Sequence, residues 1–141
     1  MLSPKSKLLP GFTALFGENR FFNEFLYFSL YGLFHRLLPN VRCRGRGVLL
    51  IPGFLAGDLS LVPLASRLRE LGCRVFFSGI WCNVECPVHT MPRLETVLRK
   101  VNHKAGGKVT LIGHSLGGTY ARELARRSPD LVERVILLGS Q

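Results

Sequence analysis

The hydrophobic pattern of the chain changes near residue 47. Before that point, residues 18–38 are apolar on most positions, and polar side chains recur every three or four residues, which predicts an amphipathic helix. Pro39 ends this helix, because proline cannot continue one. The polar stripe consists of Arg20, Glu24, Tyr27, Tyr31 and His35. We therefore predict a first segment, residues 1–46, made of this helix and a basic linker.

From residue 47 onward, short apolar runs alternate with segments of helical period. A run as apolar as Val48–Ile51 is expected in a strand buried on both faces of a parallel sheet. Strand, helix and strand in alternation predict four parallel strands joined by right-handed crossovers, an α/β doubly wound sheet with flanking helices. The predicted strands are residues 48–51, 73–77, 109–112 and 132–138, and the predicted helices are residues 59–71, 91–104 and 116–127.

The composition fits one globular domain, and the charge alters this picture little. The chain has 141 residues, of which 47% are hydrophobic and 20% charged. Its net charge of +10 would attract nucleic acid or an anionic membrane. However, the basic residues are spread over both halves, in runs no longer than two, and they form no nucleic-acid-binding motif. We expect no nucleic-acid partner.

The N-terminal helix has two interpretations. The favoured one is that its aromatic face packs on other parts of the protein, and the alternative is that residues 18–38 lie in a membrane interface as a peripheral contact. Its charge-free run, Phe25–Phe34, would be about 15 Å long as a helix, about half a bilayer core, so it does not span. The first residues lack a clear signal-peptide cleavage site. We expect a cytoplasmic protein, with export left open.

The four cysteines give no metal-binding pattern. Cys82 and Cys86 are spaced C-x3-C, but no second pair with zinc-finger spacing accompanies them. We expect Cys43, Cys73, Cys82 and Cys86 to be free thiols that are partly buried, since a disulfide requires an oxidising compartment. The sequence predicts neither a metal ion nor a cofactor.

The most specific chemical pattern is Gly113-His114-Ser115-Leu116-Gly117, which fits G-x-S-x-G. In this pattern a strand turns abruptly into a helix and leaves the serine at the apex in a strained conformation. Side chains two residues to either side of the serine would collide, so both positions are glycine. The helix that follows directs its positive end at charge developing on a substrate oxygen. We predict that Ser115 is a nucleophile.

Three stretches of the chain carry a family resemblance. LLIPGFLAGD (residues 49–58), LIGHSLGG (111–118) and YARELARRSPDLVERVILLGS (120–140) resemble bacterial α/β-hydrolases of the lipase and esterase kind. The resemblance covers residues 47–141 and implies an α/β-hydrolase domain with an ester or lipid substrate. It implies an acyl-enzyme at Ser115 and an oxyanion bound by the backbone N–H groups of Phe54 and Leu116. Many lipases have histidine where this chain has Pro52.

The resemblance also implies a catalytic acid and then a histidine after Ser115, on loops that follow later strands. The chain ends at Gln141, so we expect an incomplete hydrolase domain, preceded by the N-terminal helix. His89 is the one histidine predicted in a loop at the active edge, His114 is expected to be packed, and Asp58 is expected to cap a helix. Two alternatives stay open: an inactive membrane- or partner-binding module, and an acyltransferase. Whether this chain alone is an enzyme stays open too.

Overall fold

The computed structural model describes Cys43 and residues 45–140, so the predicted helix over residues 18–38 lies outside the described part. The described part follows the predicted alternation of strands and helices. Its elements, in chain order, are β1 (Gly47–Ile51), the short 3-10 helix η2 (Asp58–Leu61), α3 (Val62–Glu70), β2 (Arg74–Phe77), α4 (Pro87–Ala105), β3 (Val109–His114), α5 (Leu116–Arg127) and β4 (Val132–Leu138).

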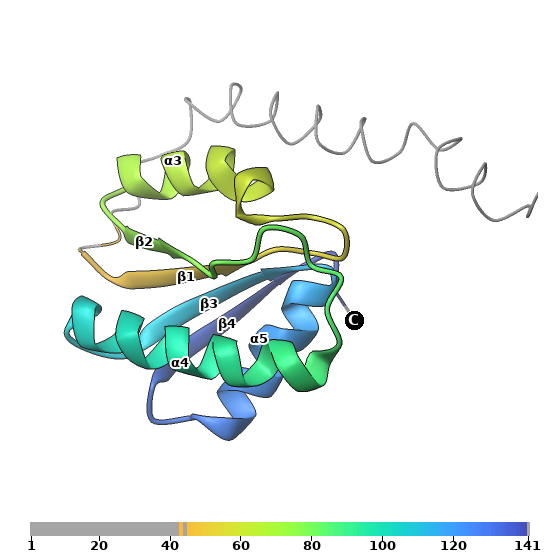
Figure 1. Ribbon diagram of the computed structural model, residues 1–141. Coiled ribbons are helices and arrows are strands. Elements are labelled where there is room, and N and C mark those ends of the chain that lie inside the picture. Colours follow the sequence, from red (N-terminus) through yellow and green to blue (C-terminus); the bar gives the residue numbers. More distant parts are fainter. Residues whose placement is uncertain (1–42, 44, 141) are drawn as a thin grey trace, which may run out of the picture. The chain divides into compact units, whose positions relative to one another are not determined.

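The four strands form one parallel sheet in the order β2-β1-β3-β4 (Figure 1). Leu49 in β1 pairs with Phe76 in β2 and with Leu111 in β3. Helix α3 lies on one face of the sheet, and α4 and α5 lie on the other (Figure 1). This confirms the predicted α/β architecture of four parallel strands with flanking helices. Because the strands are parallel, the loops that follow β1, β2 and β3 all leave the same edge of the sheet, which we call the carboxyl edge.

Strand β1 lies at the centre of the hydrophobic core. All five of its residues are buried. Val48 and Leu50 pack into the cluster beneath α3, whereas Leu49 and Ile51 pack into the larger cluster beneath α4 and α5. Burial of each such side chain contributes about 1.5–3 kcal/mol relative to exposure. The core therefore fixes where β1 ends and where the loop after it begins.

Helix α4 begins at Pro87, four residues before the predicted start. Cys86 is its N-cap in an extended conformation, and proline suits the first helical position, where its missing N–H costs nothing. The second proline, Pro92, lies inside the helix and leaves the carbonyl of Val88 without its helical donor. Val88 is 73% exposed, so water can reach that carbonyl. His89 consequently lies in the first turn of α4, and its predicted place in a loop was wrong.

The cysteines differ from the prediction in their pairing and in their exposure. Cys43 and Cys73 form a disulfide, with their Cα atoms 4.9 Å apart, so the expectation of free thiols was wrong for these two. Cys82 and Cys86 are free, as predicted, but both are exposed, so the expectation that they are partly buried was wrong. The chain before β1 runs alongside the turn between α3 and β2, where the Cys43 N–H donates to the Leu71 carbonyl at 2.8 Å. This long-range contact brings the two sulfurs together, and cysteine spacing could not reveal it.

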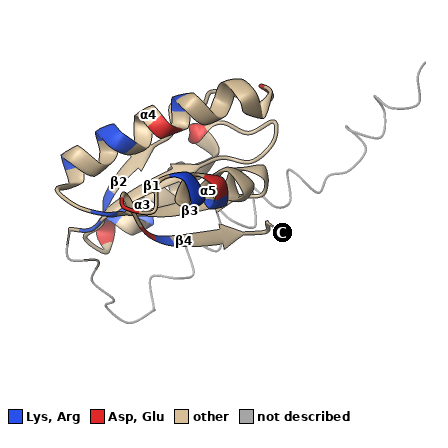
Figure 2. Cartoon of the chain, turned by 90° about the horizontal axis from the view of Figure 1, so that it is seen from below, with Lys and Arg blue, Asp and Glu red and all other residues tan. Residues whose placement is uncertain are grey.

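The described helices carry a mixed surface charge, and none of them is long and apolar enough to cross a membrane. Helices α4 and α5 each carry basic residues together with a glutamate (Figure 2). Arg127 pairs with Glu95 of α4 at 3.0 Å and with Glu123 of its own helix at 2.7 Å. The Arg127–Glu95 pair joins the two neighbouring helices on their solvent side.

Candidate active site

The strand β3 and the helix α5 meet at a single strained residue. Ser115 lies between them with φ 50° and ψ −120°, a conformation that costs free energy for any residue with a side chain. Backbone hydrogen bonds hold it on both sides: the Ser115 N–H donates to the Leu138 carbonyl, and the Gly118 N–H donates to the Ser115 carbonyl, both at 2.9 Å. The half-buried Ser115 side chain thus lies at the apex of the turn, at the carboxyl edge.

The two glycines of the motif lie where backbone segments meet closely. A Cβ atom on Gly113 would come within 2.5 Å of the Gly118 Cα atom. A Cβ atom on Gly117 would come within 2.6 Å of the Pro52 carbonyl oxygen. Neither neighbour is a flexible side chain, so a methyl group at either position would force the backbone to move. The close packing of β3, α5 and the end of β1 therefore accounts for both glycines.

The loop after β1 passes directly against this turn. We call residues 52–57 the β1 loop. Gly53 is buried, and a Cβ atom on it would lie 3.1 Å from the Ser115 Cβ and 3.0 Å from His114 Nδ1. The packing of His114 onto Gly53 agrees with its expected role as a packed residue. The β1 loop and the serine turn thus form one continuous surface.

Two backbone N–H groups next to Ser115 have no partner within the described residues. They belong to Phe54, which follows Gly53 in the β1 loop, and to Leu116, which opens α5. An unpaired N–H is usual at the first position of a helix, and such a group can donate to a negative oxygen. Phe54 is not helical, so its unpaired N–H needs a separate explanation. Both groups therefore remain able to donate a hydrogen bond near the serine turn.

Asn83 holds the β1 loop from the opposite side, and sequence analysis missed it. This residue lies in the loop between β2 and α4, which we call the β2 loop (residues 78–86), and it is 1% exposed. Its side-chain Nδ2 donates to the Pro52 carbonyl at 2.8 Å, and its backbone N–H donates to the Ala56 carbonyl at 2.9 Å. The backbone carbonyl of Asn83 accepts a hydrogen bond from the Leu55 N–H at 3.1 Å. No motif or spacing in the sequence marks Asn83.

Asp58 makes a second connection between the two loops, and its predicted role as a helix cap was wrong. The N-cap of η2 is Gly57, with no side-chain cap bond. The Asp58 carboxylate instead accepts from the Ser78 hydroxyl and from the Gly79 N–H, both at 2.7 Å. The prediction failed because the end of β2 lies alongside η2, and its donors compete with those of the helix start. Asp58 therefore fastens the far end of the β1 loop.

The structure does not bring the other candidate residues to Ser115. His89 is exposed in the first turn of α4, and His103 is exposed in its last turn. Asp130 lies in the turn that enters β4, at the opposite edge of the sheet. Across residues 45–140, no side chain hydrogen-bonds to the Ser115 hydroxyl, and no three metal-ligating side chains gather in one place. The described part thus supplies the serine and the donors of the candidate site.

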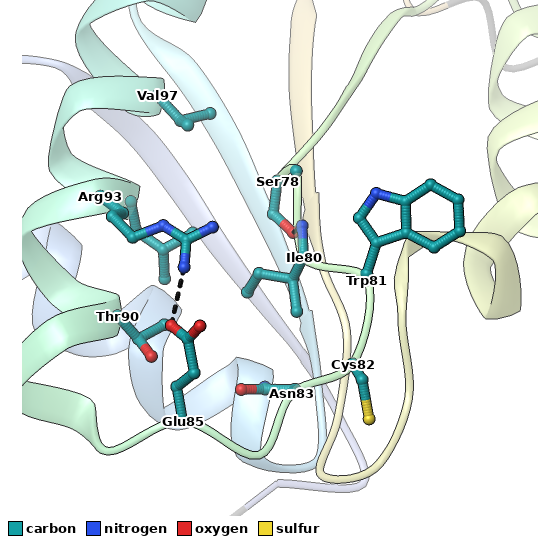
Figure 3. A pocket seen from close by; sticks show the side chains of 11 residues that line it. Ser78, Ile80, Trp81, Cys82, Asn83, Glu85, Thr90, Arg93 and Val97 are labelled. Carbon is teal, nitrogen blue, oxygen red and sulfur yellow. Dashed lines mark hydrogen bonds and ion pairs between the residues drawn. The ribbon is translucent and has the colours of Figure 1, made fainter.

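A cavity of about 370 Å³ lies between the β2 loop and α4 (Figure 3). The Glu85 and Arg93 side chains form an ion pair of 2.7 Å at this cavity, and Asn83 and Thr90 also line it. The Asn83 Oδ1 is buried and finds no partner among the described groups. The hydroxyl of Tyr120 on α5 is also buried, and this burial raises its pKa, an effect that the neighbouring Thr90 side chain partly offsets. The β2 loop therefore has a buried side-chain oxygen, Asn83 Oδ1, that could accept a further hydrogen bond.

Large apolar side chains are exposed around the carboxyl edge. Trp81 is the most exposed of them, at 88%, and its indole stands clear of the cavity residues in Figure 3. The others belong to the β1 loop, to η2, to the β2 loop and to the first turn of α4. In chain order, the set is Phe54, Leu55, Leu59, Trp81, Val84 and Val88. The approach to Ser115 is therefore apolar, in contrast to the charged outer surfaces of α4 and α5.

Known proteins share this fold. Residues 89–141 match the family model of the alpha/beta hydrolase fold. No curated protein sequence matches the chain at a significant level. Among solved structures, the chain is similar to the mature form of the lipase BlEst2 from Bacillus licheniformis, with a TM-score of 0.58 and 20% identity over 70% of this chain and 42% of that one.

Two further solved structures have the same fold as this chain. A probable hydrolytic enzyme from Pseudomonas aeruginosa has a TM-score of 0.56 and 23% identity, over 70% of this chain and 34% of that one. A monoacylglycerol lipase from Paleococcus ferrophilus has a TM-score of 0.53 and 21% identity, over 68% of this chain and 40% of that one. The chain spans less than half the length of these three structures. The family match and the common architecture identify the fold of this chain as part of the alpha/beta hydrolase fold.

Proposed function

We propose that this chain carries the nucleophile and the oxyanion-binding groups of a serine hydrolase that acts on carboxylic esters. The observation that carries the proposal is the position of Ser115, strained at the start of α5 beside two unpaired backbone N–H groups. Strain of this kind persists only where the surrounding structure holds it, and it is concentrated at functional sites. Glycine would relieve it, so a serine at this position calls for a chemical reason.

The reaction follows from this arrangement. The Ser115 hydroxyl oxygen attacks the ester carbonyl carbon while a base takes its proton, and the carbonyl oxygen becomes an oxyanion. The N–H groups of Phe54 and Leu116 donate to that oxyanion, with the positive end of α5 behind them. The C–O bond to the alcohol then breaks, and the alcohol leaves with the proton. Water attacks the resulting acyl-enzyme in the same way and releases the carboxylic acid.

Apolar esters, lipids among them, are the substrate class we propose. The exposed side chains of Phe54, Leu55 and Trp81 offer a hydrophobic approach to Ser115, where an acyl chain would bury apolar area at about 25 cal/mol per Å². Proteins that share this fold include lipases from two organisms. Short, charged esters would gain nothing from such a surface.

The proposal requires a histidine base and an acid that residues 45–140 do not present to Ser115. The test therefore uses the protein expressed from its complete reading frame, treated with a fluorophosphonate probe and assayed with nitrophenyl esters of increasing acyl length. We expect labelling at Ser115, and Ser115→Ala should abolish it and lower kcat by about 10⁵- to 10⁶-fold. The control is Ser60→Ala, which removes only a bond to the Gly57 carbonyl.

Each other outcome has a clear meaning. Equal labelling of the Ser115→Ala variant would place the nucleophile elsewhere. A wild-type protein that is folded but neither labelled nor active would refute the proposal and support an inactive binding module. Transfer of the acyl group to an added alcohol, in preference to water, would make the enzyme an acyltransferase with the same nucleophile.

A further inference from the structure

We propose that Asn83 is a positioning residue that aims the Phe54 N–H at the substrate oxyanion. This inference rests on the proposed function, because it assigns a reason for the shape of the β1 loop. The three hydrogen bonds of Asn83 end on Pro52, Leu55 and Ala56, which lie on both sides of Phe54 in the chain. The peptide group between Pro52 and Leu55 that carries the unpaired N–H of Phe54 is therefore held from both sides.

The β1 loop cannot hold this shape by itself. The Phe54 and Leu55 side chains are 52% and 45% exposed, so little apolar burial holds their backbone in place. Leu55 also has a positive φ of 58°, which disfavours the native backbone at this residue. Within the loop itself, one backbone bond is found, from the Ala56 N–H to the Gly53 carbonyl at 3.1 Å. The remaining hydrogen bonds come from the β2 loop, most of them from Asn83, and Gly53 packs against the serine turn.

Asparagine suits this position for a chemical reason. Its amide donates to the Pro52 carbonyl, which an ionised aspartate of the same shape cannot do. Its Oδ1 remains buried without a partner in the described residues, which costs free energy that an apolar residue would avoid. A buried group that is only half satisfied is retained where its other half has a role. Here that role is the bond to the carbonyl two residues before Phe54.

Asn83 acts through the loop and does not touch the reacting atoms. An oxyanion exists in the transition state but not in the bound ester, so a displaced Phe54 N–H should lower kcat and leave KM nearly unchanged. Loss of an oxyanion-hole donor costs about 10²- to 10³-fold, and a displaced donor should cost somewhat less. A residue that only stabilised the fold would change the amount of active protein and would not separate kcat from KM.

The test uses Asn83→Asp in the complete protein, with Asn102→Asp as the matched control. Asn102 makes the same kind of bond, from Nδ2 to the Gly107 carbonyl at 2.8 Å, but at the opposite end of α4. We expect Asn83→Asp to lower kcat for a nitrophenyl ester by about 10- to 100-fold with KM within about threefold, and to weaken a boronic acid transition-state analogue by the same factor as kcat. Asn102→Asp should change none of these.

A pH series adds a signature that a purely structural role would not give. The introduced carboxylate faces the Pro52 carbonyl and repels it, and burial raises the pKa of such a group. On protonation its O–H can donate to that carbonyl, so the ratio of kcat for Asn83→Asp to kcat for the wild type should rise as pH falls. Asn83→Leu, which never donates, should show a constant ratio. It is also the second variant should Asn83→Asp fail to fold.

Hydrogen exchange separates this inference from the proposed function. The Leu55 amide donates to the backbone carbonyl of Asn83, a bond that Asn83→Leu keeps. If the lost Nδ2 bond to Pro52 holds the β1 loop in place, the loop should open more often in Asn83→Leu, so the Leu55 amide should exchange faster than in the wild type, whether or not the protein hydrolyses esters. Unchanged exchange, or a kcat within about threefold of the wild type in an active protein, would overturn the positioning role. An inactive wild type with faster exchange in Asn83→Leu would refute the proposed function and with it the catalytic meaning of the bond.

Discussion

The two halves of the candidate active site are held in place by different forces. The serine turn, residues 113–117, is fixed by steric packing: its two glycines let backbone segments meet at distances that no side chain would allow. The β1 loop is fixed by hydrogen bonds to the β2 loop, through Asn83 at one end and Asp58 at the other. One half therefore depends on the absence of side chains at its own two glycines, whereas the other depends on polar side chains that hydrogen-bond to residues 20 or more positions away.

This difference predicts how substitutions in each half affect stability and catalysis. Where backbone packs on backbone, an added side chain cannot be accommodated, because backbone atoms cannot rotate out of its way. A substitution there should therefore reduce both stability and catalysis. The loss of a hydrogen bond between loops should cost less stability, because water can replace a lost partner near the surface. Substitutions in the β2 loop should therefore affect catalysis more than folding. The following experiments test this contrast, beginning with the largest expected effect.

Gly117→Ala should be the most damaging. The new Cβ would meet the Pro52 carbonyl oxygen at 2.6 Å, so β1 and α5 would have to separate. We expect a loss of unfolding free energy on the order of 3 kcal/mol, together with the loss of Ser115 labelling. The measurements are denaturant unfolding and probe labelling on the same samples. Gly107→Ala is the control, because a Cβ on Gly107 meets nothing within 4 Å.

A stable and fully labelled Gly117→Ala variant would show that the turn is not fixed by packing. Reduced labelling at unchanged stability would show that the turn is held as loosely as the β1 loop. Either result would remove the contrast between the two halves.

Asp58→Asn should have an intermediate effect. The carboxylate accepts from the Ser78 hydroxyl and from the Gly79 N–H through its two oxygens, and an amide has only one oxygen to offer. We expect a loss of about 1–2 kcal/mol in unfolding free energy, and a fall in kcat of several-fold as the β1 loop loosens. The control is Asp130→Asn, because the Asp130 carboxylate has no hydrogen bond or ion pair to the rest of the described chain.

The two measurements on Asp58→Asn can disagree, and the disagreement is informative. If stability falls while kcat stays equal to that of the wild type, then Asp58 fastens η2 and contributes nothing to the shape of the loop near Phe54. Asn83 would then hold that shape alone.

The same contrast decides what the sequence could reveal. The bounds of α5 and β4 were predicted correctly, because each depends on a local pattern of apolar positions and on the glycines and turn residues beside it. The strained turn at Ser115 was predictable for the same reason: its cause lies within five consecutive residues. Parallel pairing followed from the alternation of strands and helices, since it needs no knowledge of individual contacts.

Most of the errors concern contacts between distant segments, and one, the early start of α4 that places His89 in a helix, is local. Asn83 could not be found, because an asparagine in a loop carries no sign of which carbonyl it will meet. Asp58 was assigned to the nearest helix start, although donors at the end of β2 lay closer in space. The Cys43–Cys73 disulfide joins residues 30 apart. In each case the partner is fixed by the sheet, and the sheet's register is a property of the whole domain.

Glu123→Gln should have the smallest effect and serves to sharpen the contrast. Hydrogen bonds from Arg126, and then from Arg127, lower the pKa of Glu123 from 4.5 to about 2. A lowered folded-state pKa means that the carboxylate stabilises the fold above about pH 4.5, and that this contribution is lost as pH falls towards 2. The wild type should therefore melt slightly higher than the variant at neutral pH, and the gap should close on acidification. Because Glu123 and its two arginine partners are at the surface, 1 M salt should also narrow the difference in melting temperature between the wild type and the variant.

Glu123 lies on the same helix that Ser115 begins, but in its last turns. If the serine turn is held by its own packing, labelling of Ser115 at neutral pH should proceed at the same rate in Glu123→Gln as in the wild type. A change of more than about threefold would mean that loosening one end of α5 is felt at the other. The turn would then depend on distant residues as the β1 loop does, and the two halves of the site would differ only in degree.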